Sequence, residues 1–193
     1  MDERVEAVRR ELEAKKLRAD QGEGVPLWSV PREEGRWLSL LVHATSARRI
    51  LEVGASAGYS GTWLAEAARD TGGRVVTLER DPVKVEMARA TYREAGLEPW
   101  ITLVPGDARM TLASLEGPWD LVFLDAWKDD YALYLEEVWP KLRPGGLLLA
   151  DNALSHAQEL AEYLGAVRTR PDAESLLLPE GNGLEVTFKR AGA

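Results

Sequence analysis

The sequence contains no cysteine and only two histidines, His43 and His156. The missing thiols exclude disulfides, cysteine nucleophiles and thiolate zinc sites, and two imidazoles are too few for a histidine-rich metal site. A metal ion would therefore be held mainly by oxygen. Apolar runs long enough to span a bilayer are also missing, and the charged start at Asp2-Glu3-Arg4 is unlike a signal segment. We therefore expect a cytoplasmic protein without a membrane partner.

Positive charge is in deficit, because 24 lysine and arginine residues stand against 32 acidic residues, for a formal net charge of -8. Lysine and arginine also occur in blocks no longer than a dipeptide. Such a surface repels polyanions on average, which makes nucleic acid an unfavoured partner and a small molecule the expected one.

Hydrophobic spacing predicts two helices at the start of the chain, over residues 3–20 and from about 32 to 44. The pattern then changes to short apolar runs that alternate with helical segments. The runs predict strands at 49–53, 74–78, 101–104, 120–124 and 146–150. The segments between them predict helices at 60–69, 82–95, 108–114 and 129–142. Pro144-Gly145-Gly146 is expected to form the turn that leads into the fifth strand.

This alternation predicts an α/β fold with a mostly parallel sheet that helices cover on both faces. After Asp151 the pattern predicts one helix over about 155–164 and short strands at 166–169, 175–178 and 184–189. The last two strands are expected to be joined by a tight turn. The length of 193 residues, without a linker or an internal repeat, predicts a single domain over residues 1–193.

The loop after the first strand has the glycines of a ligand-binding turn, since in an open α/β sheet ligands bind beyond the carboxyl ends of the strands. Gly54 and Gly58 suit a tight turn into a helix, with backbone N–H groups that face a ligand. A dinucleotide-binding loop would need the pattern G-x-G-x-x-G, but Ser56 and Tyr59 occupy its second and third glycine positions. The loop therefore disfavours a nicotinamide-dependent oxidoreductase. An ordinary turn without a ligand stays open as an alternative.

Two further strands are followed by acidic residues. Glu79 ends the second strand, 25 residues after Gly54, where a carboxylate can accept hydrogen bonds from both hydroxyls of a ribose. A solvated carboxylate at the end of a strand is the alternative for Glu79. Asp107 follows the third strand and can cap the next helix or meet the amino group of an adenine, and the two roles are compatible.

Oxygen donors follow the fourth and fifth strands, with Asp125 after the fourth and with Asp151 and Asn152 after the fifth. Neighbouring strands lie roughly 4.8 Å apart, so these side chains would converge on one small volume. Bare carboxylates there would repel each other, and a hard cation relieves that repulsion. Three oxygen donors, completed by water and substrate oxygens, suit Mg²⁺. The sequence therefore predicts a metal site at Asp125, Asp151 and Asn152.

In their order and spacing these motifs resemble the catechol and caffeoyl-CoA type O-methyltransferases. The resemblance covers about residues 26–190. It is carried by Ile50 to Ala65, Glu79, Gly106-Asp107-Ala108, Asp125-Ala126-Trp127-Lys128, Tyr131, Pro144-Gly145-Gly146, Asp151-Asn152 and Leu178 to Leu184. It implies a Rossmann-like methyltransferase fold with a seven-stranded sheet and an antiparallel C-terminal strand. It also implies a homodimer, with the N-terminal helices over 1–45 as a lid or dimer element.

The same resemblance implies S-adenosylmethionine as the cofactor, a divalent cation (expected to be Mg²⁺) at the predicted metal site, and Lys128 as the catalytic base. Cofactor contacts would come from Val30, Glu52, Gly54, Ser56, Gly58, Tyr59, Ser60, Glu79, Arg80, Asp107, Ala108, Asp125 and Trp127. Two alternatives stay open here: Lys128 as a solvated residue at a helix start, and Trp127 as a core residue.

The chemistry of these residues agrees with the resemblance. A phenol hydroxyl is a weak nucleophile until it loses its proton, metal coordination lowers its pKa, and a nearby amine can take the proton. The expected reaction is the transfer of a methyl group from S-adenosylmethionine to a hydroxyl of a small catechol-like aromatic. One alternative is methylation of a tRNA hydroxyuridine, which the acidic balance disfavours. Another is a non-catalytic cofactor-binding module, which the set Asp125, Lys128, Asp151 and Asn152 disfavours.

Overall fold

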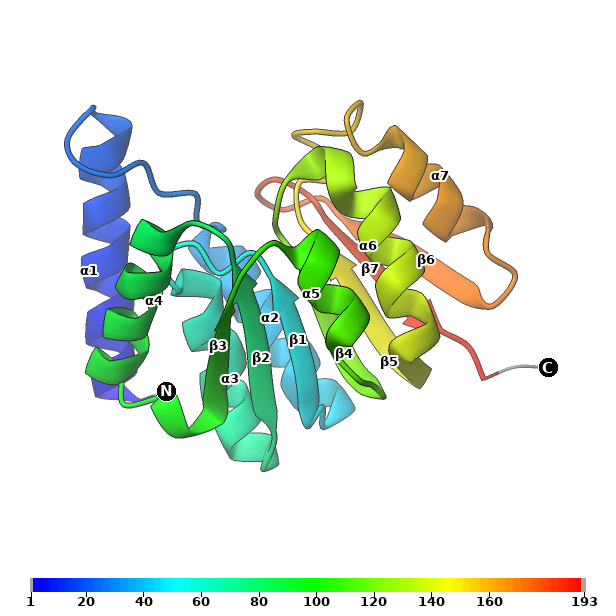
Figure 1. The fold of residues 1–193 in the computed structure, drawn as a ribbon, viewed down its shortest axis with the longest axis horizontal. Helices are drawn as coiled ribbons and strands as arrows, with labels where there is room; N and C mark the ends of the chain where they lie inside the picture. The colour runs from blue at the N-terminus through cyan, green and yellow to red at the C-terminus, as the bar shows by residue number, and fades with distance from the viewer. Residues whose placement is uncertain (1, 192–193) are drawn as a thin grey trace.

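A seven-stranded sheet in the order β3-β2-β1-β4-β5-β7-β6 forms the centre of the computed structural model, which describes residues 2–191 (Figure 1). The parallel strands are β1 (Arg49–Val53), β2 (Arg74–Glu79), β3 (Ile101–Pro105), β4 (Trp119–Leu124) and β5 (Leu142–Ala150). The antiparallel pairs are β7 (Leu184–Lys189) with β5, and β6 (Ala173–Leu178) with β7. The predicted seven-stranded sheet, parallel but for its C-terminal part, is confirmed. Residues 1, 192 and 193 of the predicted single domain lie outside the described residues.

Helices cover both faces of the sheet and bury a separate apolar cluster on each. One face carries α2 (Arg32–Thr45), α3 (Tyr59–Thr71) and α4 (Pro82–Glu94), with α1 (Glu3–Asp20) against α3 and α4. The other face carries α5 (Ala108–Ser114), α6 (Tyr131–Val138) and α7 (Ala161–Thr169) (Figure 1). Among residues 2–191, no helix is both long and apolar enough to cross a bilayer.

The region around the fourth and fifth strands differs from the prediction in two ways. The helix expected over 129–142 is divided into η2 (Lys128–Asp130), α6 and η3 (Trp139–Lys141). Pro140 lacks the backbone N–H that a continuous helix would need there. Pro144-Gly145-Gly146, expected as a turn, lies inside β5. The pairing of β5 with β4 is irregular along this stretch, so the strand starts earlier than the apolar run suggested.

The segment after β5 also differs from the prediction. Residues 151–160 form turns, and the helix expected over 155–164 begins only at Ala161. Residues 166–169, predicted as a strand, complete α7 instead. Val167 is fully buried in the cluster under α6 and α7. Tertiary packing of this residue therefore overrides the preference of β-branched side chains for strands.

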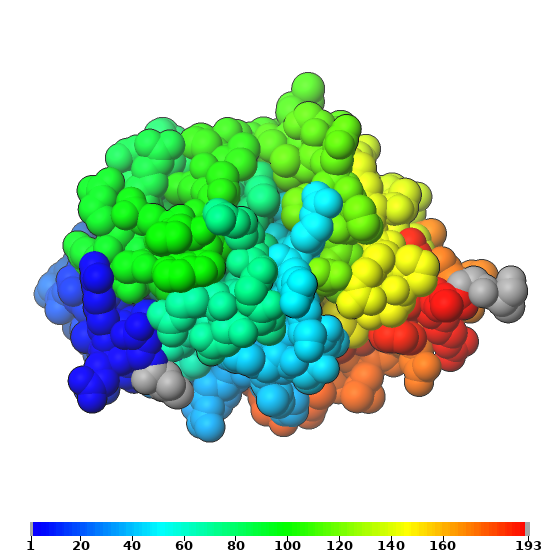
Figure 2. Space-filling model, turned by 90° about the horizontal axis from the view of Figure 1, so that it is seen from below, coloured from blue at the N-terminus to red at the C-terminus, as the bar shows by residue number. Residues whose placement is uncertain are grey.

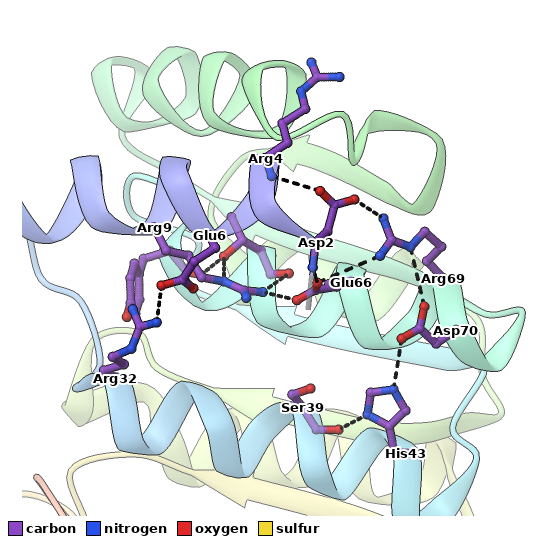
Figure 3. A network of polar contacts seen from close by, with 12 residues as sticks. Asp2, Arg4, Glu6, Arg9, Arg32, Ser39, His43, Glu66, Arg69 and Asp70 are labelled. Atoms are coloured by element: carbon purple, nitrogen blue, oxygen red, sulfur yellow. Dashed lines mark hydrogen bonds and ion pairs between the residues drawn. The ribbon is translucent and has the colours of Figure 1, made fainter.

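A buried arginine fastens α1 to α3 (Figure 3). Arg9 is fully buried and pairs with Glu66 at 2.8 Å. Its guanidinium donates to the hydroxyl of Thr62 at 3.0 Å and to the carbonyl of the same residue at 2.9 Å. The guanidinium carbon also lies 3.6 Å from the ring centroid of Trp63. These contacts offset the desolvation of two charges that would otherwise cost several kcal/mol.

The start of α1 is held separately, against the end of α4. Arg4 donates to the carbonyl of Arg93 at 2.9 Å and to that of Glu94. Figure 2 shows the blue start of α1 next to the green segment that follows α4, with the red strand β7 at the far end of the molecule. The N-terminal helix α1 is therefore the outermost helix of this layer, next to α4.

We expect Arg9→Ala to lower the free energy of unfolding by about 3 kcal/mol or more, because the carboxylate of Glu66 stays buried without its main partner. Arg10→Ala is the matched control, since Arg10 pairs with Glu6 while its own side chain is 72% exposed. That change should cost less than about 1 kcal/mol. Urea denaturation followed by circular dichroism measures both variants. Equal losses of unfolding free energy in the two variants would show that the buried Arg9–Glu66 pair stabilises the protein no more than an exposed pair.

Candidate active site

Backbone hydrogen bonds align the carboxyl ends of five neighbouring strands in one row. The N–H of Asp125 donates to the last residue of β1 at 2.9 Å, and the N–H of Asp151 donates to the last residue of β4 at 3.0 Å. On the other side of β1, the N–H of Gly106 donates to the carbonyl of Glu79 at 2.8 Å. The groups predicted for the cofactor and for the metal therefore follow one another along a single edge of the sheet.

Gly54 is the position where β1 and β4 approach most tightly. Its φ is 104°, and an added Cβ would lie 2.1 Å from the carbonyl oxygen of Asp125. Only glycine tolerates both the backbone conformation and the contact. Ser56 and Gly58 follow with φ values of 47° and 90°, so the loop turns sharply into α3. The predicted tight turn is therefore present, beside the end of β4 that precedes Asp125.

The carboxylate of Glu79 ties this loop to the end of β2. Its Oε2 accepts a hydrogen bond from the backbone N–H of Ser56 at 2.7 Å. Its Oε1 accepts from the N–H groups of Arg80 and Asp81, both at 2.9 Å. A carboxylate offers about four acceptor positions, so capacity remains for a ribose hydroxyl. Glu79 thus shapes the loop and keeps free acceptor capacity.

Glu52 is a fully buried carboxylate beneath the same loop. Its Oε2 accepts a hydrogen bond from the hydroxyl of Thr77 at 2.5 Å, while Oε1 has no partner among residues 2–191. Burial raises the pKa of Glu52 to about 7, against the opposing effect of the hydroxyls of Ser60 and Thr77. An unpaired buried acceptor calls for a donor, and a bound ligand at this loop would supply one.

Two predicted cofactor residues direct their side chains elsewhere. Tyr59 is buried, and its hydroxyl donates to Glu13 of α1 at 2.6 Å while its ring meets the edge of Trp63. Val30 is buried in the apolar cluster shared by α2 and α3. These two residues can therefore offer a cofactor mainly their backbone atoms.

Two exposed tryptophans stand beside the row, and each has a cation over its ring. The guanidinium carbon of Arg80 lies 5.5 Å from the ring centroid of Trp127, and the Nζ of Lys84 lies 3.7 Å from that of Trp28. Trp127 is 58% exposed and Trp28 is 66% exposed. Trp127 is therefore not a core residue, and its free ring surface can form a wall against a flat ligand.

Asp107 caps α5, as one of its two predicted roles required. Its carboxylate accepts from the backbone N–H of Arg109 at 3.0 Å and pairs with the guanidinium of the same residue. This pairing lowers the pKa of Asp107 to about 2. Ala108 follows in the first turn of α5 and is buried. A ligand amine at Asp107 would therefore share the carboxylate with Arg109.

Asp125 of the predicted metal site lies beside one amine, and Asp151 is close enough for its charge to act on Asp125. Asp151 and Asn152 are buried, and Asp125 is partly buried. The Nζ of Lys128 lies 3.3 Å from Oδ1 of Asp125 and donates to the carbonyl of Ala126 at 2.9 Å. Burial raises the pKa of both aspartates, and the charge of Asp151 adds to this effect on Asp125. Lys128 opposes the shift, so the structure compensates only part of the negative charge.

This donor set fits a hard divalent cation. Two carboxylates and the amide of Asn152 are oxygen donors of the kind that Mg²⁺ prefers. Among residues 2–191, no three His, Asp or Glu side chains are grouped closely enough to hold an ion by themselves. The amide, water and substrate oxygens would therefore complete the coordination.

A further carboxylate that the sequence analysis did not single out faces this cluster. Glu34 of α2 is 1% exposed, and neither carboxyl oxygen has a hydrogen-bond partner among residues 2–191. Burial, together with the charges of Asp151 and Asp125, raises the pKa of Glu34 to about 10. A signal was present in the sequence, because Glu34 shares a helical stripe with the core residues Leu38 and Val42.

Two surface hollows lie away from the row of strand ends. One is on the outer side of α2 around Trp37 and Leu40, and the other lies beside α7 around Leu164 and Leu177. Neither is lined by a predicted site residue. The candidate site is therefore defined by its converging polar groups and not by the hollows of the surface.

Comparison with known proteins agrees with this geometry. The model of a family described as O-methyltransferase matches residues 6–169. The chain belongs to the O-methyltransferase family. A catechol O-methyltransferase of Mycobacterium tuberculosis is 36% identical over 172 residues, which cover 89% of this chain and 78% of that protein. A catechol O-methyltransferase of Niastella koreensis is 37% identical over 143 residues, which cover 72% of this chain and 64% of that protein.

Solved structures of methyltransferases share the fold. The SAH-bound Podospora anserina methyltransferase PaMTH1 superposes with a TM-score of 0.85 at 25% identity, over 99% of this chain and 89% of that chain. The predicted Rossmann-like methyltransferase fold is confirmed. Family and fold are those of S-adenosylmethionine-dependent O-methyltransferases, which confirms the predicted class of enzyme.

We expect Glu52→Gln to stabilise the cofactor-free enzyme more at pH 8 than at pH 5. The folded-state pKa of about 7 lies above the ordinary value of 4.5. The folded protein therefore keeps a proton that the unfolded chain releases, and stability falls as the pH rises between these two values. Above both pKa values the free energy of unfolding is lower by on the order of 3 kcal/mol. A glutamine at position 52 does not titrate, so the variant shows no such loss. Urea denaturation of both proteins at the two pH values measures the difference, and parallel pH profiles would contradict the assignment.

Proposed function

We propose that this protein transfers a methyl group from S-adenosylmethionine to a hydroxyl of a small catechol-like aromatic, with Mg²⁺ as the divalent cation. The observation that carries the proposal is the amine of Lys128 beside the carboxylate of Asp125, at the edge of the sheet where Asp151 and Asn152 follow the neighbouring strand β5. The two catechol O-methyltransferases, at 36% and 37% identity, support the class of acceptor.

The proposed mechanism divides the work between two groups of residues. A bound cation supplies the positive charge that lowers the pKa of an acceptor hydroxyl, and bound S-adenosylmethionine supplies the methyl group. Asp125, Asp151 and Asn152 would hold the cation, and Lys128, positioned by its contacts with Asp125 and Ala126, would take the proton of the hydroxyl.

On the cofactor side, the loop that begins at Gly54 would present its backbone to the cofactor, and Glu79 would accept from the ribose hydroxyls. Arg80 and Trp127 would border the ligand at the open side. Because both groups of residues belong to one sheet edge, they would hold the methyl donor and the acceptor close together. Holding two reactants in a productive orientation lowers the barrier to the transfer.

Two alternatives predict different acceptors. A tRNA hydroxyuridine is disfavoured by the net charge of -8. A module that only binds the cofactor would need neither the amine of Lys128 nor the three oxygen donors beside it. A screen of diphenols and hydroxylated nucleosides, with and without Mg²⁺, distinguishes these functions.

The homodimer stays a prediction from the family, and light scattering of the purified protein tests it.

We expect Asp151→Asn to reduce Mg²⁺-dependent methylation of catechol by about 100-fold or more, since a neutral amide replaces an anionic ligand. Affinity for S-adenosylmethionine should change little, because Asp151 lies at the end of β5 and not at the cofactor loop. Asp129→Asn is the control, with the same chemical change at an exposed position. A radiometric methyl-transfer assay and calorimetric titration of the cofactor measure the two effects. Unchanged turnover in Asp151→Asn would remove the metal role.

We expect Glu79→Ala to weaken S-adenosylmethionine binding by about 1–3 kcal/mol, the scale of hydrogen bonds to a charged acceptor. Part of the effect would come from the loop, which loses the contact between Glu79 and the N–H of Ser56. Glu86→Ala on α4, where the side chain is 73% exposed, serves as the control. Equilibrium titration gives both dissociation constants, and an unaltered value for Glu79→Ala would place this carboxylate outside the site.

A further inference from the structure

Glu34 is a buried carboxylate that the proposed reaction does not use. Helix α2 brings it to the cluster at the ends of β4 and β5, where its carboxyl lies beside Asp151. The turn between β6 and β7 covers it from another side, because a Cβ added to Gly181 would lie 3.6 Å from Oε2 of Glu34 and 2.9 Å from Pro31. Glu34 is thus enclosed between the cluster, its own helix and this turn.

Two other buried carboxylates, Glu66 and Glu185, have cationic partners. Glu66 pairs with Arg9 at 2.8 Å, and Glu185 accepts two hydrogen bonds of 2.7 Å from Arg168. Glu34, in contrast, is bordered by the carboxyl group of Asp151, and neither of its oxygens accepts a hydrogen bond from an N–H or hydroxyl donor of residues 2–191. Burying a carboxylate without a cationic partner is unfavourable, and a cluster of three acids makes it more so. The described residues therefore leave a positive charge or a hydrogen-bond donor missing at this place.

We infer that Glu34 completes the cation site by accepting a hydrogen bond from water bound to the ion that Asp125, Asp151 and Asn152 would hold. This inference rests on the metal site of the proposed function. The contact is through water, because no three His, Asp or Glu side chains of the described residues are close enough to hold one ion directly. Mg²⁺ keeps several of its waters in protein sites, and groups that accept from such waters tune its affinity.

The inference makes the ion a link between two parts of the chain. Glu34 belongs to the helix that precedes the sheet, whereas the three ligands follow β4 and β5. Binding of the ion would then also favour the docked position of α2. A ligand that binds only the folded state raises the unfolding temperature by mass action, so this link has a readout that is independent of methyl transfer.

The experiment uses Mn²⁺ as the probe and the purified full-length chain. Electron paramagnetic resonance of free Mn²⁺ gives the affinity, and thermal unfolding with and without Mn²⁺ gives the stabilisation. Glu34→Gln should weaken Mn²⁺ binding by about tenfold and reduce the Mn²⁺-induced rise in Tm. Glu33→Gln, the same chemical change at the exposed neighbouring position of α2, should behave as the wild type. Asp151→Asn should abolish binding.

The outcomes separate this inference from the function on which it rests. Wild-type Mn²⁺ affinity in Glu34→Gln, together with loss of binding in Asp151→Asn, would overturn the role of Glu34 and leave the metal site standing. Absence of Mn²⁺ binding by the wild type would overturn both. If Glu34→Gln does not fold, Glu34→Asp keeps the charge with a shorter reach. An unchanged Mn²⁺ affinity in that variant would equally overturn the inference.

Discussion

The contact between Gly54 and the backbone of Asp125 is the constraint on which the site depends. The chain builds one half of the sheet from β1 to β3 and then returns, so that β4 pairs with β1 although the two strands are far apart in the sequence. This is the reversal of strand order at which open α/β sheets bind ligands. A side chain at position 54 would separate the two halves. The cofactor loop on one side and the acidic cluster on the other are adjacent because this position has none.

The acidic cluster of Asp125, Asp151 and Glu34 has less charge compensation than the buried carboxylates that pair with arginine. Burial raises the pKa values of Asp125, Asp151 and Glu34, and Lys128 is the cation that opposes this for all three. Strongly perturbed carboxyl groups at the ends of sheet strands are typical of functional sites. Glu66 and Glu185, which are equally removed from solvent, each pair with an arginine. That contrast separates the carboxylates that pair with arginine within the fold from those whose negative charge is only partly compensated.

The parallel strands, and the residues that follow their carboxyl ends, could be predicted from the sequence. Apolar runs bounded by glycine and proline mark buried parallel strands, and parallel strands end at one edge, so the proximity of Asp125 and Asp151 could be predicted without coordinates. The directions of side chains could not. Tyr59 begins α3 directly after the loop at Gly54, yet its hydroxyl donates to Glu13, which is 46 residues away in the sequence. No local pattern contains that contact.

Two other differences between the prediction and the structure also come from contacts with residues that are distant in the sequence. Glu34 has the position of a first-turn helix acid, a role that needs no burial, and the acidic cluster together with the turn between β6 and β7 encloses it. Residues 166–169 carry β-branched side chains that favour a strand, but the cluster under α6 and α7 accepts Val167 as part of a helix. In both cases a tertiary partner that lies elsewhere in the chain decides the outcome.

The turn between β6 and β7 has a consequence for the order in which the protein is made. Its glycines pack against Pro31 and Leu154, and β7 fills the place beside β5. A nascent chain on the ribosome that has emerged only as far as α7 would have β5 as an open edge strand, with its cluster of acids uncovered. Open edges of this kind invite pairing with other chains. Synthesis of the last two strands therefore protects the sheet and covers Glu34 in the same step.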